Sequence, residues 1–279
     1  MIEYHEFFGA KSGPSLLLLG GVHGNEPCGV IAINKIIDEI KRRHIVIKTG
    51  RLICVPLCNE RAFSANTRYS DENLNRVIRI HDNPTTYEQE LANMIVPFIK
   101  SSDYVLDLHS QHVDGEAFCF VGRNESSVVN FAQATGAQFI ITGWNDLYRT
   151  DLDYSTEDYA GSIGKIATTV ECGGHQSSQS PVVAYNAIIN IMQFLGMIEG
   201  LVMRNNHKTI TMTEVVSYNG GKFAKDWRTF DPLYTDDIIA LDASGNKIQA
   251  GYDGCIILPN PSAKIGEEWF YIGRYSPLE

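Results

Sequence analysis

The chain alternates short apolar runs with longer stretches in which apolar residues recur every three or four positions. The short runs predict strands at residues 16–20, 51–57, 103–109, 117–121, 137–142 and 166–171. The periodic stretches predict amphipathic helices at residues 29–42, 84–100, 126–135 and 181–198. Strands that alternate with helices in this way predict an α/β fold, in which helices cover both faces of a central sheet. The polar stretch 58–76 predicts a long loop.

The pattern changes after about residue 200. From Lys208 onward, short β-like runs are separated by turn sequences such as Asn219-Gly220-Gly221 and Asp253-Gly254. We therefore expect two domains: an α/β domain at residues 1–204, which would hold the active site, and a small all-β domain at residues 205–279 that borders it.

Composition excludes several classes of partner. The 279 residues carry a net charge of −10, and the sequence has no basic stripe. Nucleic acids and anionic membranes require concentrated Lys and Arg, so neither is expected as a partner. The start of the chain lacks a basic signal-peptide segment, and the apolar run at 16–19 is too short to span a membrane, so the sequence predicts a cytoplasmic protein. The six cysteines are dispersed, which favours buried reduced thiols over disulfides.

The turn that follows the first strong strand carries two residues of the kind that bind metals. His23 and Glu26 lie three positions apart in a glycine-rich turn. One imidazole and one carboxylate suit Zn²⁺, which would need a third ligand from elsewhere. By themselves the two residues are equally compatible with a histidine in a polar turn and a glutamate at the start of a helix.

Two later strands also end in metal-type or acid/base side chains, His109 and Glu171. The carboxyl ends of parallel strands meet at one edge of a sheet, so these residues should lie near His23 and Glu26. Two histidines and one glutamate make a three-ligand catalytic zinc site, and Glu171 would then be the base for a water molecule. The alternatives are a hydrogen-bonded core histidine and a structural ion pair.

Five short motifs in this order resemble the succinylglutamate desuccinylase/aspartoacylase family. They are His23-Gly24-Asn25-Glu26, Arg68-Tyr69, Asn75-Arg76, Asp107-Leu108-His109 and Val170-Glu171. The resemblance covers residues from about 15 to 200, and the small β-domain is similar to the one that this family appends. It implies a zinc carboxypeptidase-like fold, with a mixed sheet flanked by helices.

The resemblance also implies a role for each motif. One zinc ion per chain would be held by His23, Glu26 and His109, with Glu171 as general acid/base in amide hydrolysis. Arg68 would polarise the scissile carbonyl. Asn75 and Arg76 would grip a substrate carboxylate, since a guanidinium binds one through a bidentate fork.

Several assignments remain open at this stage. Arg68, Asn75 and Arg76 could instead form a solvated loop face, in which Asp71 and Glu72 pair with the arginines. Tyr271 and Tyr252 of the β-domain are candidates for substrate contact, and we do not count His112 among the ligands.

The substrate is narrowed by one departure from the family. Aspartoacylases place a substrate-binding arginine shortly before the base glutamate, whereas Tyr159-Ala160-Gly161-Ser162 has none and Arg149 is the nearest candidate. Asn59 is also followed by Glu60 where the family usually has proline, but this change has little bearing on the substrate. An N-acyl amino acid with a single free carboxylate is therefore the expected small-molecule substrate.

Two other functions fit the same residues. A metallocarboxypeptidase would use the same metal, base and carboxylate clamp on a peptide C-terminus, and a non-catalytic scaffold could bind a metabolite through the same fold. The sequence leaves the oligomeric state open, a homo-oligomer included.

Overall fold

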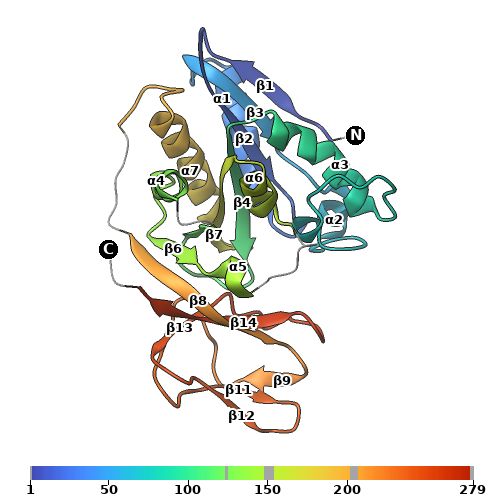
Figure 1. The fold of residues 1–279 in the computed structure, drawn as a ribbon, viewed down its shortest axis with the longest axis vertical. Helices are drawn as coiled ribbons and strands as arrows, with labels where there is room; N and C mark the ends of the chain where they lie inside the picture. The colour runs from blue at the N-terminus through green and yellow to red at the C-terminus, as the bar shows by residue number, and fades with distance from the viewer. Residues whose placement is uncertain (1, 123–124, 148–153, 202–206, 277–279) are drawn as a thin grey trace.

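A computed structural model describes residues 2–122, 125–147, 154–201 and 207–276. Its centre is a mixed sheet of eleven strands in the order β1-β3-β2-β4-β7-β5-β6-β8-β14-β13-β10. Figure 1 shows helices on both sides of the first part of this sheet and only strands and turns in the C-terminal part. The predicted α/β architecture with a mixed sheet flanked by helices is therefore confirmed.

Four parallel strands form the middle of the sheet: β2 (Lys11–Gly20), β3 (Thr49–Val55), β4 (Tyr104–Gln111) and β7 (Ile166–Gly174). The four leucines of β2 are fully buried because both faces of the sheet are covered. Leu16 and Leu18 point to one hydrophobic core, and Leu17 and Leu19 point to the other. An unbroken apolar run is thus what this strand requires.

Helices on the two faces of the sheet complete these two hydrophobic cores. One face carries α1 (Pro27–Lys41), α4 (Ser126–Ala134) and α7 (Ser180–Phe194). The other carries α3 (Tyr87–Lys100), which retains Pro97 inside the helix, and α6 (Thr156–Ser162). All four amphipathic helices that the sequence predicts are present.

The polar stretch 58–76 is not the continuous loop that its composition predicts. It contains the helix α2 (Glu60–Ala65) and the short 3-10 helix η1 (Leu74–Arg76). Asn59 starts α2, because its side-chain oxygen accepts a hydrogen bond from the backbone N–H of Ala62. The error arose because α2 is short and has little of the apolar periodicity that marks a longer helix.

The remaining strands of the α/β part complete the edge near the C-terminal region. β5 (Phe118–Phe120) runs antiparallel to β7 and parallel to β6 (Phe139–Thr142), which makes the sheet mixed. A short helix, α5 (Trp144–Leu147), follows β6. The opposite edge is β1 (His5–Phe8), antiparallel to β3.

The C-terminal strands continue the same sheet. β8 (Lys208–Ser217) pairs with β6, and β14 (Glu268–Tyr275), β13 (Gly254–Ile257) and β10 (Pro232–Leu233) follow it. A second sheet is formed by β9 (Gly221–Phe223), β11 (Ile238–Asp242) and β12 (Lys247–Gln249). The all-β character expected here agrees with the structure, but continuity with the main sheet was not foreseen. The division at residue 204 falls outside the described residues and stays a prediction.

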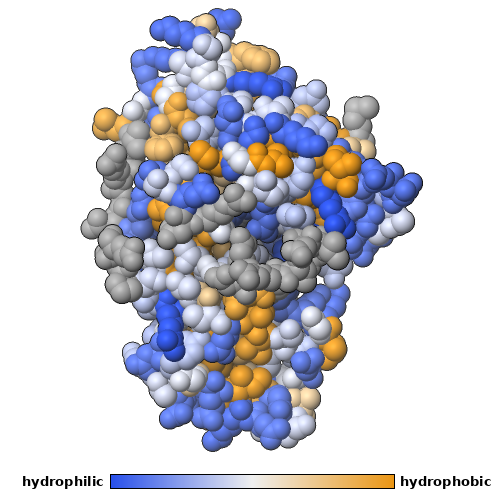
Figure 2. Space-filling view, in the orientation of Figure 1, coloured by the Kyte–Doolittle hydropathy of each residue, from blue (hydrophilic) through white to orange (hydrophobic). Residues whose placement is uncertain are grey.

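The face of the protein in Figure 2 is mainly polar, and the cysteines lie in the interior. Figure 2 shows small hydrophobic patches separated by hydrophilic residues on the face in view. All six cysteines are buried and free, as expected. Within the described ranges, no helix is both long and apolar enough to cross a membrane.

Candidate active site

The three predicted metal ligands converge at the carboxyl end of two neighbouring strands. His23 and Glu26 lie in the turn between β2 and α1, and His109 lies near the end of β4, which pairs with β2. The Nδ1 atoms of the two histidines are 3.1 Å apart. Glu26 Oε1 is 2.9 Å from Nδ1 of His23, and Glu26 Oε2 is 3.0 Å from Nδ1 of His109. Each of the three residues is only 2% exposed.

This arrangement fits a zinc ion. Metal-type donor atoms of His23, Glu26 and His109 all lie within 4.8 Å of one another. Tetrahedral bonds of about 2.0–2.1 Å separate neighbouring ligand atoms by about 3.4 Å, so a small adjustment of the side chains would admit the ion. Two ring nitrogens that face each other share at most one proton, whereas both could donate a lone pair to a cation. The two-histidine, one-carboxylate set is one that catalytic zinc sites use.

Further contacts orient the two imidazoles. Nε2 of His23 lies 3.0 Å from Oδ1 of Asn73, within hydrogen-bond distance. Nε2 of His109 lies 2.9 Å from Oδ2 of Asp107, an ion-pair contact without hydrogen-bond geometry among the described residues. With a proton on each Nε2, both Nδ1 atoms are left to bind metal. Asp107 in turn accepts a 2.6 Å hydrogen bond from the Thr156 hydroxyl.

Burial and neighbouring charges set the protonation of the metal-free site. Burial and the Arg68 guanidinium lower the pKa of His23 to about 4, which favours the neutral ring that a metal requires. Burial disfavours the charged carboxylate of Glu26, but the two neighbouring imidazoles outweigh burial and hold the pKa of Glu26 well below its usual range. Burial also opposes a charge on His109, but the carboxylates of Asp107 and Glu26 raise its pKa well above the usual range.

The turn that carries the ligands packs closely against α2. A Cβ atom on Gly24 would overlap the backbone of Ala62 and Phe63. The Gly24 N–H also donates a 3.2 Å hydrogen bond to the Arg68 carbonyl. We call residues 21–26, which carry His23 and Glu26, the metal turn. Glycine is required at position 24 so that the metal turn can lie close to α2 and to the segment that follows it.

Glu171 lies directly opposite His109 on the adjacent strand β7. Its side chain is 8% exposed, and within the described part of the chain its Oε2 atom is buried without a hydrogen-bond partner. Phe118 of β5 is its neighbour on the other side. Burial, followed by the charge of Glu26, raises the pKa of Glu171 well above its usual range. A buried acceptor without a partner, beside a donor set for zinc, suits a group that handles a substrate proton.

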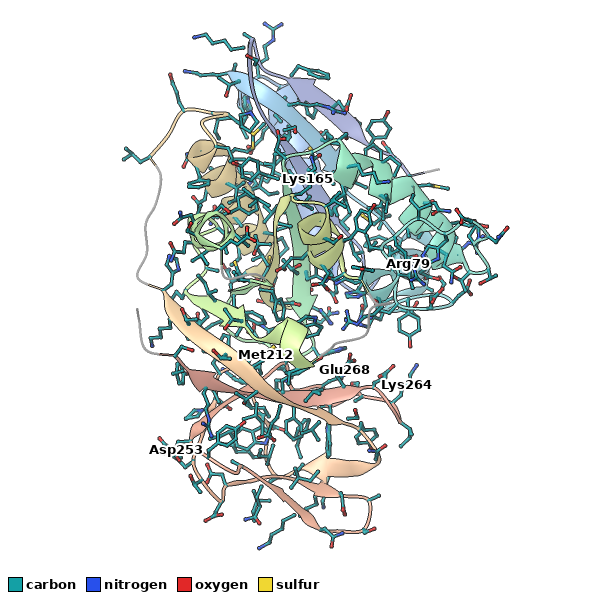
Figure 3. All side chains as sticks on the ribbon, in the orientation of Figure 1. Arg79, Lys165, Met212, Asp253, Lys264 and Glu268 are labelled. Carbon is teal, nitrogen blue, oxygen red and sulfur yellow. The ribbon has the colours of Figure 1, made fainter. Side chains whose placement is uncertain are left out.

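The two arginines and Asn75 also reach the site. Nη1 of Arg68 donates a 2.9 Å hydrogen bond to Glu26 Oε1. Nη2 of Arg76 lies 3.4 Å from Oε1 of Glu268 on β14. Figure 3 shows Glu268 at the junction of the C-terminal strands with the helix-flanked part. Oδ1 of Asn75 accepts a 2.9 Å hydrogen bond from Thr156 N. The arginines thus pair with Glu26 and Glu268, whereas Asp71 and Glu72, considered as partners from the sequence, bond to the start of α3.

A pocket joins these groups, and its empty space of about 630 Å³ includes open solvent. Seven of the eight predicted site residues line it: His23, Arg68, Asn75, Arg76, His109, Glu171 and Tyr271. The eighth, Glu26, is not among the lining residues. Tyr252 is not among them either, and its ring lies under the Arg274 guanidinium. His112 packs edge-on against His175 and is not part of the donor set.

Other lining residues escaped the sequence analysis. Phe120, Trp144 and Leu258 supply apolar surface, and Glu157 and Glu268 supply carboxylates. None carries a sequence signal, because two strands, two helices and the residue that follows β13, all far apart in the chain, must assemble before these side chains meet. Arg149 lies outside the described residues.

Comparison with known sequences identifies the family. Residues 12–193 match the succinylglutamate desuccinylase/aspartoacylase catalytic domain, which covers well over half of the chain. The chain belongs to this family.

Two curated relatives extend the match. The chain is 28% identical over 200 residues to N-alpha-acetyl-L-2,4-diaminobutyric acid deacetylase of Halomonas elongata, a match that covers 67% of this chain and 56% of that enzyme. It is 24% identical over 289 residues to succinylglutamate desuccinylase of Pseudoalteromonas atlantica, covering 92% of this chain and 80% of the relative. The chain therefore spans just over half the length of the deacetylase it matches.

Solved structures share the fold over nearly the whole chain. The ectoine utilization protein EutE (DoeB) of Ruegeria pomeroyi superposes with a TM-score of 0.80 at 24% identity, covering 98% of this chain and 89% of that one. A succinylglutamate desuccinylase/aspartoacylase of Rhodobacter sphaeroides gives 0.80 at 18% identity, covering 99% and 90%. The C-terminal β region is thus part of the shared fold.

Proposed function

We propose that the protein is a zinc-dependent hydrolase that cleaves the amide bond of an N-acyl amino acid. The observation that carries the proposal is the buried Oε2 atom of Glu171, which has no hydrogen-bond partner among the described residues and lies one strand away from the donor set of His23, Glu26 and His109. Both curated relatives are named for the removal of an acyl group from an amino acid, which supports this substrate class.

One zinc ion would be held by His23, Glu26 and His109. When bound, it would supply Lewis-acid chemistry, which lowers the pKa of water and polarises a carbonyl group. Asn73 and Asp107 keep the two imidazoles oriented for this role.

Glu171 would move the proton. As water adds to the amide carbonyl carbon, the carboxylate accepts a proton from it and delivers a proton to the nitrogen while the C–N bond breaks. The products are a free acid and an amine. Burial beside Phe118 keeps the carboxyl away from bulk water and raises its pKa, which suits a group that must both take and give a proton.

Arg68 and Arg76 would act on different parts of the substrate. Arg68 approaches the donor set through Glu26, so its charge can oppose the negative charge that develops on the carbonyl oxygen. Arg76 and Asn75 lie further along the same segment and would bind the substrate carboxylate. Oδ1 of Asn75 already accepts from Thr156 N, so its amide N–H₂ would make the substrate contact. Tyr271 lines the same cavity and would contribute to binding.

A panel of substrates tests the proposal. Zinc-loaded protein is incubated with N-acetyl and N-succinyl amino acids and, in parallel, with dipeptides that share the same C-terminal residue, and the released amines are quantified. Faster turnover of the acyl amino acids supports a deacylase. Preference for the dipeptides would indicate a carboxypeptidase, and no turnover of either set would indicate a binding scaffold.

A further inference from the structure

A buried carboxylate outside the cavity holds the segment that carries both arginines. Glu88, in the first turn of α3, is 0% exposed. Its Oε1 atom accepts hydrogen bonds from Ser70 N at 2.8 Å and from Asn59 Nδ2 at 2.9 Å. Its Oε2 atom accepts from Asp71 N at 3.1 Å and from Glu72 N at 3.3 Å. Three consecutive backbone amides therefore converge on one side chain.

The backbone that Glu88 holds lies between the residues proposed to act on substrate. Arg68 is two residues before Ser70, and Asn75 and Arg76 are three and four residues after Glu72. Immediately after Glu72 comes Asn73, whose side chain contacts the metal-site residue His23. A shift of this backbone would move the groups on both sides of it.

The Glu88 carboxylate is also connected to the metal turn through Asn59. Asn59 donates to Glu88 through Nδ2, and its Oδ1 atom caps the start of α2. The backbone N–H of Asn59 donates a 2.9 Å hydrogen bond to the Gly21 carbonyl. α2 is the helix against which Gly24 packs. Glu88 thus connects α3, α2 and the arginine segment at one buried point.

Peripheral contacts reinforce this connection without replacing it. Asp71 accepts a 2.9 Å hydrogen bond from the backbone N–H of Tyr87, and Glu72 accepts a 2.8 Å hydrogen bond from Gln89. Asp71 is exposed and Glu72 is half-buried, so water can substitute for their partners. The Glu88 carboxylate and the Asn59 side chain that donates to it are both 0% exposed, so water cannot take the place of Glu88 as the common acceptor.

We infer that Glu88 is a positioning residue, which sets Arg68, Asn75 and Arg76 in register with the metal site although it touches neither the cavity nor the ligands. The inference rests on the proposed function, because the reaction supplies its kinetic readout. A purely structural role would predict loss of stability alone. A positioning role also predicts a change in how the enzyme recognises the substrate carboxylate.

The test is Glu88→Gln, with Glu90→Gln as matched control. Glutamine keeps the shape of glutamate but replaces one acceptor oxygen with an N–H₂ group that faces backbone N–H donors. Glu90 lies in the same helical turn, is exposed, and is no partner of the arginine segment. In Glu88→Gln, we expect kcat/KM to fall about tenfold or more, as for loss of a hydrogen bond to a charged group, while zinc content stays unchanged. Glu90→Gln should match wild type.

The decisive readout is discrimination between an N-acyl amino acid and its analogue with the carboxylate converted to an amide. Glu88→Gln should reduce this ratio, and adding Glu88→Gln to Arg76→Ala should cost less than it does alone. A lowered melting temperature with the ratio unchanged would overturn the inference. If the glutamine variant does not fold, Glu88→Asp carries the same test: a reduced ratio supports the positioning role, and an unchanged ratio contradicts it.

Hydrogen exchange separates this inference from the proposed function. Glu88→Gln should speed amide exchange at residues 70–72, whereas Glu90→Gln should not. If wild-type protein hydrolyses no N-acyl amino acid, the proposed function fails, and the anchoring of the segment is still decided by the exchange rates. Unchanged exchange in Glu88→Gln would contradict the anchor itself.

Discussion

His109 and Glu171 are direct neighbours across the parallel pair β4 and β7. One residue belongs to the donor set for a metal, and the other has a buried carboxyl oxygen without a hydrogen-bond partner in the described structure. Paired residues on adjacent strands point to the same face of a sheet. The register of two strands therefore places the proposed base beside the proposed metal centre.

The donor set predicts about one zinc per chain, by the three-ligand rule for catalytic sites. Loss of a residue that only hydrogen-bonds a metal ligand typically lowers metal affinity about 10- to 100-fold. His109→Ala removes a ligand itself and should lower zinc affinity by more than this. His112→Ala is the control, because His112 lies three residues further on and outside the donor set. Metal analysis after dialysis against a chelator measures the effect. Wild-type zinc affinity in His109→Ala would show that the ligands are assigned wrongly.

Packing of the metal turn predicts that Gly24→Ala destabilises the protein by about 1–3 kcal/mol, the usual cost of overpacking. The added methyl group would overlap the backbone of α2 and push the ligand turn away. Zinc affinity should therefore fall together with the unfolding free energy. Gly251→Ala is a suitable control, because its added methyl group would meet open space. Equal stability of both variants and wild type would contradict the packing argument.

The fold could largely be predicted from the sequence because its signals are local. The apolar residues 16–19 need both faces covered, and the three strand ends carry their chemistry within a few residues of the strand. Arg76 and Glu268 are 192 positions apart, and no local pattern connects them. Glu88 illustrates the same limit. In a sequence it is an acidic residue favourable at the start of a helix, and only tertiary packing makes it a buried acceptor.

Different roles for the two arginines predict different kinetic effects. Arg68→Ala should act mainly on kcat, because its interaction strengthens as the carbonyl oxygen gains charge. Arg76→Ala should act mainly on KM, with a loss of about 2–4 kcal/mol in binding if the ion pair is desolvated. Both variants are assayed on one N-acyl amino acid and on its carboxamide analogue. The Arg76 variant should lose most of the discrimination between them and the Arg68 variant should keep it; the reverse pattern would exchange the roles.

The raised pKa of Glu171 predicts the pH dependence of turnover. The carboxyl must be deprotonated to accept a proton, so activity falls as pH drops through its pKa. Because burial raises this pKa above the ordinary value of 4.5, the acidic limb of the kcat/KM profile should lie above pH 4.5. The profile is measured at saturating zinc, with zinc occupancy checked at each pH. A profile that stays flat down to pH 4.5 would contradict this protonation behaviour.

The most direct test of the account is turnover by zinc-loaded Glu171→Gln. The amide keeps the shape of the side chain but cannot accept the proton, so kcat should fall about a hundredfold or more. Zinc content should remain about one per chain, since Glu171 is not in the donor set. The measurement is kcat on the best N-acyl amino acid, with metal content determined on the same sample. A fall of this size with the metal retained is the predicted result, and near-normal turnover would contradict the assignment of Glu171 as the proton carrier.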